Sequence, residues 1–297
     1  MLNIYNKRWI FIAVSAVVIL AGLISFFIQG GLNVDIDFAG GTSIVFNTTD
    51  KNASQDDIVS IVKEAVPGIS GTIRAQATTD KPEEFTIKTM ALSTAQSEAV
   101  LDALKAKYVP DAENYNDYSV SSFTAAYGKQ LAQEAGLALF IAIALMLIYI
   151  SVRFEFLSGV SAIIALIHDV LIMLSIYAIF GISVNSSFIA VILTILGYSI
   201  NNTIVVFDRV RENRKLARKE TMAEIVDKSI TGTLGRSINT TITTLIMVVL
   251  LFILGGNSIR EFALPLIIGL IGGAYSSIFI VSPVWAMMKG ANKKAVK

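Results

Sequence analysis

Three clusters of polar and ionisable side chains lie within or beside long apolar runs of this chain. They comprise His168 and Asp169; Ser199, Asn201, Asn202, Thr203, Asp208 and Arg209; and Arg236, Asn239 and Thr240. An ionisable group inside a membrane is costly and normally faces a protein neighbour or a water-filled cavity. Carboxylates, imidazoles, amides and hydroxyls at that depth are suited to binding or passing a proton or another cation. The chemistry indicated is ion coupling, and the sequence does not indicate an enzyme.

The pair His168 and Asp169 lies about midway along an uncharged run. An ionised carboxylate at the centre of a bilayer costs about 2.5–3.5 kcal/mol on insertion scales, so Asp169 needs a partner or a proton. His168 is able to act as a proton relay, or only to hold Asp169 in place by a hydrogen bond. The sequence leaves both interpretations open.

The other two clusters lie at the ends of apolar runs. On a helix, Ser199, Asn202 and Val206 fall on one face, which indicates contact with a protein neighbour. Arg236 opens a run rich in hydroxyl and amide side chains. One interpretation is that this arginine extends to the phosphates at the membrane surface. The alternative is that it pairs with a polar group of the preceding helix.

The apolar runs predict a polytopic α-helical membrane protein with six transmembrane helices. The predicted spans are Ile10–Ile28, Ala135–Val152, Phe156–Phe180, Phe188–Phe207, Ser237–Asn257 and Phe262–Met288. Nineteen uncharged residues reach roughly 28 Å, enough to cross a bilayer core. The first run is too long for a signal peptide and lacks a small-residue cleavage site. The chain therefore divides into a first transmembrane helix (residues 9–30), an extramembrane domain (31–130) and a five-helix domain (131–290).

Composition supports this division. The chain is 54% hydrophobic and 16% charged, with a mean hydropathy of +0.65, which excludes an ordinary soluble protein. It contains no cysteine and one histidine, so disulfides, thiolate nucleophiles and multi-histidine metal sites are excluded. We expect no metal and no cofactor. No basic arm with interleaved aromatic residues is present, and nucleic-acid binding is not expected.

Residues 31–130 alternate polar and apolar positions and predict one α+β domain. Strands are expected at Thr42–Asn47, Gly71–Thr78, Glu84–Met90 and Tyr115–Phe123, and helices at Gln55–Val66 and Thr94–Tyr108. The order βαββαβ favours a ferredoxin-like domain. Asp35 and Asp37 precede it, and two carboxylates without a third ligand favour a solvated strand entry over an ion site.

Charge predicts the orientation. Residues 31–130 contain 8 Lys and Arg against 14 Asp and Glu, whereas the remainder contains 16 against 9. The segment 208–236 is the most basic connection, and Thr221 to Glu224 forms a capping box there. We expect a short amphipathic helix along the membrane surface in this segment. The positive-inside rule then predicts cytoplasmic termini, a cytoplasmic segment 208–236 and an extracytoplasmic domain 31–130.

The stretch from Gly197 to Asn213 resembles the signature GYSxNDxxVVxDRxREN of the SecF family, membrane subunits of bacterial protein export. Residues Leu32–Ala39 resemble that family's LNxGIDFxGG segment, and His168 and Asp169 with Val170 resemble its His-Asp-Val. The segment after Gly235 resembles a family helix in which an arginine precedes serines and threonines. The chain departs from the family at Asn202, where the signature has an intramembrane Asp.

The resemblance implies an RND-like membrane fold in the bacterial cell (inner) membrane, with SecD, the SecYEG channel and an unfolded polypeptide in transit as partners. It implies coupling to the proton motive force through protons or Na⁺, with no cofactor. In the family the arginine partners the intramembrane Asp, but here Arg236 and Asn202 cannot form a salt bridge. The resemblance nevertheless favours a paired site, in which Asn202 accepts a hydrogen bond from the Arg236 guanidinium. Asn202 resembles the protonated state of that Asp. Two alternatives stay open: half of an RND-type small-molecule or lipid exporter, and a structural membrane subunit that has lost coupling.

Overall fold

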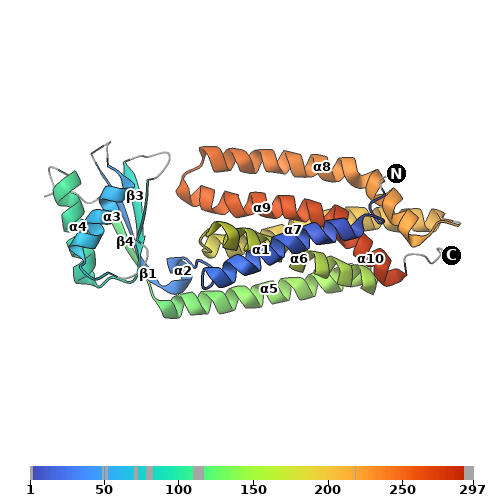
Figure 1. The fold of residues 1–297 in the computed structure, drawn as a ribbon, viewed down its shortest axis with the longest axis horizontal. Helices are drawn as coiled ribbons and strands as arrows, with labels where there is room; N and C mark the ends of the chain where they lie inside the picture. The colour runs from blue at the N-terminus through green and yellow to red at the C-terminus, as the bar shows by residue number, and fades with distance from the viewer. Residues whose placement is uncertain are drawn as a thin grey trace.

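The computed structural model describes residues 3–48, 50, 53–69, 73–77, 83–109, 117–217 and 219–290. Long helices run side by side along the longest axis, and a small α/β unit lies at one end of them (Figure 1). The start of α1 and the end of α10 lie at the opposite end of the bundle. The α/β unit is therefore separated from the start of α1 and the end of α10 by the length of the helices.

Within the described residues, six helices are long and apolar enough to cross a membrane. They are α1 (Arg8–Ile28), α5 (Ala125–Arg153), α6 (Phe156–Phe180), α7 (Ser186–Leu216), α8 (Met222–Leu254), and a sixth span made of α9 (Asn257–Phe279) and α10 (Val281–Lys289). The predicted six-helix membrane fold is confirmed. The helix α6 has the bounds expected from the sequence.

The segment 208–236 differs from the expectation. Its first residues continue α7 to Leu216, and its last residues belong to α8, so the short separate surface helix is wrong. The capping box at Thr221 is present, but it begins a helix of 33 residues. Two glycines inside this helix each cost only about 1 kcal/mol relative to alanine, which packing against α7 and α9 outweighs.

The extramembrane unit contains a four-stranded antiparallel sheet and two helices. In chain order these are β1 (Gly41–Asn47), α3 (Gln55–Ala65), β2 (Arg74–Ala77), β3 (Glu84–Thr89), α4 (Thr94–Tyr108) and β4 (Tyr118–Phe123). The strand order is β2-β3-β1-β4. Alternate residues of the strands, such as Ile44 and Phe85, pack on helix residues such as Val62 and Leu104. The predicted strand residues 71–72, 78 and 115–116 lie outside the described residues.

A short segment joins the unit to the bundle. Val34 forms a parallel bridge with Val184 in the turn between α6 and α7, and the Asp35 amide donates to the Val184 carbonyl at 2.9 Å. The short helix α2 (Ile36–Ala39) then packs on α5, where a Cβ at Gly128 would lie 2.2 Å from the Phe38 carbonyl oxygen. The sheet lies toward the bundle and α3 and α4 lie away from it (Figure 1).

Candidate functional site

A buried carboxylate forms the centre of the site. Asp169 on α6 is 1% exposed. Its Oδ2 accepts hydrogen bonds from Ser199 Oγ of α7 at 2.6 Å and from Ser276 Oγ of α9 at 2.9 Å. Its Oδ1 lies 3.0 Å from Nδ1 of His168. The side chains of three helices therefore meet at one carboxyl group.

His168 extends this cluster to a fourth helix. Its Nε2 lies 2.8 Å from Oγ of Ser15 on α1, and its ring stacks with Tyr275 of α9 at a centroid distance of 6.2 Å. With the ring proton on Nδ1, the imidazole donates to Asp169 and accepts from Ser15. A hydrogen-bonded path runs from Ser15 through His168 to Asp169. These five residues, Ser15, His168, Asp169, Ser199 and Ser276, are called the Asp169 cluster below.

Close packing of α7 on α9 makes the cluster possible. A Cβ at Gly269 would lie 2.5 Å from Cγ1 of Ile195, and one at Gly273 would lie 3.2 Å from Cβ of Ser199. Glycine at these two positions lets the helices approach until Ser199 and Ser276 reach the same carboxylate oxygen. The small-residue pattern of the last helix thus has a defined consequence for the site.

The partners of Asp169 decide its chemistry. Among the described residues they are two hydroxyls and one imidazole, and no lysine or arginine forms an ion pair with it. Hydroxyls are able to donate to a carboxylate and to accept from a carboxylic acid. The cluster is therefore able to hold Asp169 with or without a proton.

The predicted pair of Asn202 and Arg236 is not formed. Asn202 is buried on α7, and its Nδ2 has no hydrogen-bond partner among the described residues. Arg236 is exposed on α8 and forms no hydrogen bond with Asn202. The two helices are joined instead by Tyr198, whose hydroxyl lies 3.1 Å from Oγ1 of Thr241.

The remaining predicted site residues do not enter the Asp169 cluster. On α7, Asn201 is exposed and Thr203 is buried, Asp208 lies 3.9 Å from Arg153, and Arg209 pairs with Glu212 at 2.6 Å. On α8, Asn239 and Thr240 are exposed, and the Thr240 hydroxyl donates to the Arg236 carbonyl. Ser199, Asn202 and Val206 are all buried, as their shared helix face predicted.

A second buried carboxylate lies between the extramembrane unit and the bundle. Asp35 is 4% exposed, and the interpretation of a solvated strand entry is wrong for it. Lys88 of β3 donates to Asp35 Oδ2 at 2.8 Å and approaches Glu261 of α9 at 3.4 Å. Glu261 also accepts from Asn185, the N-cap of α7, at 2.8 Å. Burial alone would lower the pKa of Lys88, but Asp35 and Glu261 outweigh it and raise that pKa.

Several of these residues were missed by sequence reasoning. Ser15 and Glu261 gave no local signal, because their partners are 153 and 173 residues away in the chain. Ser276 follows Gly269, Gly272 and Gly273, and small residues at this spacing indicate close helix packing but no site. Lys88 lies in a strand of alternating polar and apolar residues, and that pattern does not indicate a buried ion pair.

Comparisons with known proteins agree with the fold. The family described as "Protein export membrane protein SecD/SecF, C-terminal" matches residues 100–291. The protein translocase subunit SecF of Alicyclobacillus acidocaldarius is 36% identical, over 97% of this chain and 92% of that protein. The SecDF subunit of Thermus thermophilus is 36% identical over 89% of this chain and 35% of its own length. A crystal structure of the Thermus SecDF, entitled a translocon-associated membrane protein, has a TM-score of 0.81 at 31% identity, over 96% of this chain and 38% of that one.

Proposed function

The chain belongs to the SecF family of protein translocase subunits, and we propose that it uses proton movement at the Asp169 cluster to drive its extramembrane domain during protein export. The family is an accessory to translocation, and six apolar helices make this a multi-pass membrane protein. The observation that carries the proposal is a buried carboxylate held by hydroxyls and an imidazole, without a cation. Such a group changes charge when it takes up a proton.

One helix connects this group to the extramembrane domain. Along α9, Ser276 bonds Asp169, and Glu261 meets Lys88 of the sheet. The two positions are fifteen residues apart, about 22 Å along a helix. Pro265 lies between them, and a proline inside a helix removes one backbone hydrogen bond and permits a bend. A proton on Asp169 weakens its bond to Ser276, and α9 transmits the change to Lys88.

The proposed orientation in the membrane rests on the charge distribution, and the proposed partners rest on the relatives. We assign both chain ends to the cytoplasm of a bacterial cell and the domain 31–130 to the exterior, because lysine and arginine concentrate at the opposite end from that domain. SecD is the proposed partner, since relatives named SecDF contain this chain as about a third of their length. The SecYEG channel and an unfolded polypeptide are the proposed further partners.

The finer fold of the domain is also a proposal. The element order βαββαβ and the antiparallel order β2-β3-β1-β4 support a ferredoxin-like domain. In that arrangement both helices cover one face of the sheet. The uncovered face then carries Lys88 toward Asp35 and Glu261.

Asn202 supports a second function. A side-chain amide does not titrate, so the route through the fourth and fifth spans is closed to protons in this chain. If Asp169 were only a structural group, the chain would be a structural subunit of the export machinery without coupling. The relatives are named translocase subunits, and the alternative of a small-molecule exporter has no support among them.

The variant Asp169→Asn distinguishes a proton-coupled subunit from a structural one. The full chain is reconstituted in vesicles with SecD and the export channel. The amide keeps the size of the side chain but cannot carry a proton. We expect export driven by the proton motive force to fall by about tenfold, within the usual range of coupling between linked sites. Asp102→Asn, an exposed carboxylate of α4, is the matched variant and should export normally. Unchanged, uncoupler-sensitive export by Asp169→Asn would favour the structural subunit.

A further inference from the structure

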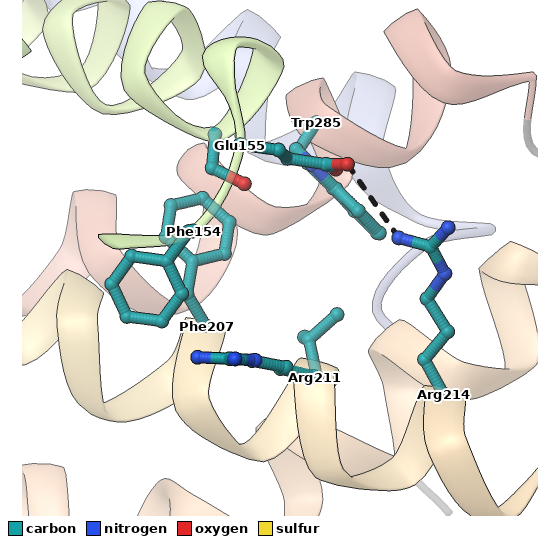
Figure 2. A pocket seen from close by; sticks show the side chains of 8 residues that line it. Phe154, Glu155, Phe207, Arg211, Arg214 and Trp285 are labelled. Carbon is teal, nitrogen blue, oxygen red and sulfur yellow. Dashed lines mark hydrogen bonds and ion pairs between the residues drawn. The ribbon is translucent and has the colours of Figure 1, made fainter. Parts of the chain in front are cut away.

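A cavity lies at the end of the bundle where α1 begins and α10 ends, away from the Asp169 cluster. It has a volume of about 130 Å³ and lies between the α5–α6 connection, the last turns of α7 and α10. Its walls are formed by Phe154, Glu155, Ser158, Phe207, Val210, Arg211, Arg214 and Trp285. Figure 2 shows the two arginines rising from α7 and Glu155 on the opposite side. Pockets for drug-sized ligands measure about 300–1,000 Å³, so this one suits only a small group.

The single carboxylate in the wall is already neutralised. Glu155 accepts from Trp285 Nε1 at 2.9 Å and from Lys289 Nζ at 2.5 Å, and it lies 3.5 Å from Arg214. Burial alone would raise the pKa of Glu155, but Lys289, Trp285 and Arg214 outweigh it and hold that pKa below its ordinary value. Glu155 therefore stays ionised at neutral pH and balances the cations nearest to it.

Arg211 is left with unused donors. A guanidinium has five N–H groups. Within the described part of the chain, the Arg211 side chain makes one long hydrogen bond, from Nη1 to the Arg153 carbonyl at 3.5 Å. Its neighbours are otherwise engaged, since Arg209 pairs with Glu212 and Asn213 donates to Ser229 on α8 at 2.8 Å. Of the basic residues that follow the apolar part of α7, Arg211 and Arg214 line the cavity, and Arg214 already lies close to Glu155.

The cavity thus combines excess positive charge with aromatic walls. Two arginines, Arg211 and Arg214, and one carboxylate, Glu155, line the cavity, and Lys289 also binds Glu155 from outside the lining. Guanidinium groups bind phosphate through paired N–H donors and tolerate aromatic neighbours. Aromatic residues such as Trp285 are typical of the headgroup level of a membrane, and basic pockets between helices at the cytoplasmic surface suit anionic headgroups.

We propose that this cavity binds the phosphate group of an anionic ligand through Arg211. The ligand is the headgroup of an anionic phospholipid, from the membrane leaflet at this end of the bundle. The phosphate receives the free N–H donors of Arg211, with Arg214 as a second cation. The ligand lies against the α5–α6 connection, α7 and α10, and so holds together three elements that are distant in sequence. Proton coupling plays no part in this site, so the two proposals stand or fall separately.

The test uses the full chain, purified in a neutral detergent and titrated with phosphatidylglycerol, phosphatidylcholine or inorganic phosphate. Native mass spectrometry counts the bound lipid, and thermal unfolding is recorded for each variant without and with ligand. The variant is Arg211→Gln. The matched variant is Lys215→Gln, which removes the same charge from the same helix at an exposed position outside the cavity wall.

We expect the unaltered chain and Lys215→Gln to prefer phosphatidylglycerol, and Arg211→Gln to bind it about tenfold more weakly, because a charge-assisted contact is lost. Its unfolding temperature without ligand should match that of the unaltered chain. If inorganic phosphate alone stabilises the unaltered chain but not Arg211→Gln, the phosphate site holds and its source is the free ion. Equal lipid binding by Arg211→Gln, or equal losses in both variants, would overturn the proposal.

Discussion

Two of the buried carboxylates among the described residues, Asp169 in the bundle and Asp35 at the domain junction, are buried to nearly the same extent, at 1% and 4% exposed. Their partners differ in kind. Asp35 has the ammonium group of Lys88 at 2.8 Å, whereas Asp169 has two hydroxyls and an imidazole. A buried carboxylate beside a fixed cation stays ionised, because removing either charge leaves the other unpaired. One held by groups that both donate and accept is free to change its charge.

The two carboxylates therefore have different roles in the proposed function: the contact at Asp35 transmits movement to the sheet, and the Asp169 cluster takes up the proton. Asp35, Lys88 and Glu261 form a fixed ionic contact that joins the sheet to α9. In the proposed function, the Asp169 cluster is the part that gains and loses a proton. The same helix, α9, contributes Glu261 to the ionic contact and Ser276 to the Asp169 cluster. Under this proposal, a change at the cluster reaches the α/β unit through the ionic contact.

The largest effect should come from Lys88→Met, which leaves Asp35 buried without its cation. Breaking a buried ion pair on one side costs about 3 kcal/mol, and unfolding of the full chain in detergent measures this loss. Proton uptake by Asp169, followed as a carboxyl signal in difference infrared spectra, should persist while export falls. The double variant Asp35→Asn with Lys88→Met should recover most of the stability, since neither charge remains.

Lys63→Met, at an exposed position of α3, provides the comparison for a lysine without a buried partner. It should change stability by less than about 0.5 kcal/mol. A loss in Lys88→Met no larger than this would mean that Asp35 is not held by its cation, and the contrast between the two carboxylates would fail.

A smaller effect is expected from Asn202→Asp, which adds a second carboxyl group at membrane depth. We expect export driven by the proton motive force to rise about threefold, a coupling of less than 1 kcal/mol. Adding Arg236→Ala should cancel the gain if Arg236 turns toward the new carboxylate. If export still rises when Arg236→Ala is added, the carboxylate at position 202 acts without a cationic partner, as Asp169 does.

Asn201→Asp is the matched change, because this neighbouring residue is exposed. It should leave export unaltered. Equal export by the unaltered chain and by Asn202→Asp would mean that the fourth span has no coupling residue, and the Asp169 cluster would carry coupling alone.

The smallest effect should come from Ser276→Ala, which removes one hydrogen bond to Asp169. A single hydrogen bond contributes about 0.5–1.5 kcal/mol net, and because two other partners of Asp169 remain, loss of this one should lower export only about twofold. Ser277→Ala is matched in burial, but its hydroxyl donates only to the Ala274 carbonyl of the same helix. Export rates of the two variants are compared in the same vesicles. Identical rates would exclude a role in export for the hydrogen bond between Ser276 and Asp169.

The membrane helices, the α/β domain and the family could be predicted from local patterns in the sequence. Uncharged runs of about twenty residues have few other stable states, because only a helix satisfies every backbone group in lipid. Alternating apolar residues likewise predicted the strand positions of β1 and β3, and the pair His168 and Asp169 marked the buried carboxylate of α6 and its imidazole partner. These features depend on neighbours in the chain, so local patterns suffice to find them.

The contacts between polar groups of different helices could not be predicted from the sequence. Ser15, Ser199 and Ser276 come from three helices, and the sequence does not record how those helices pack against α6. The same holds for Lys88 with Glu261, and for Arg236, which the sequence placed beside Asn202 and the structure leaves exposed. The register between helices is set by side-chain packing, such as the glycines that bring α9 onto α7, and this packing involves residues far apart in the chain.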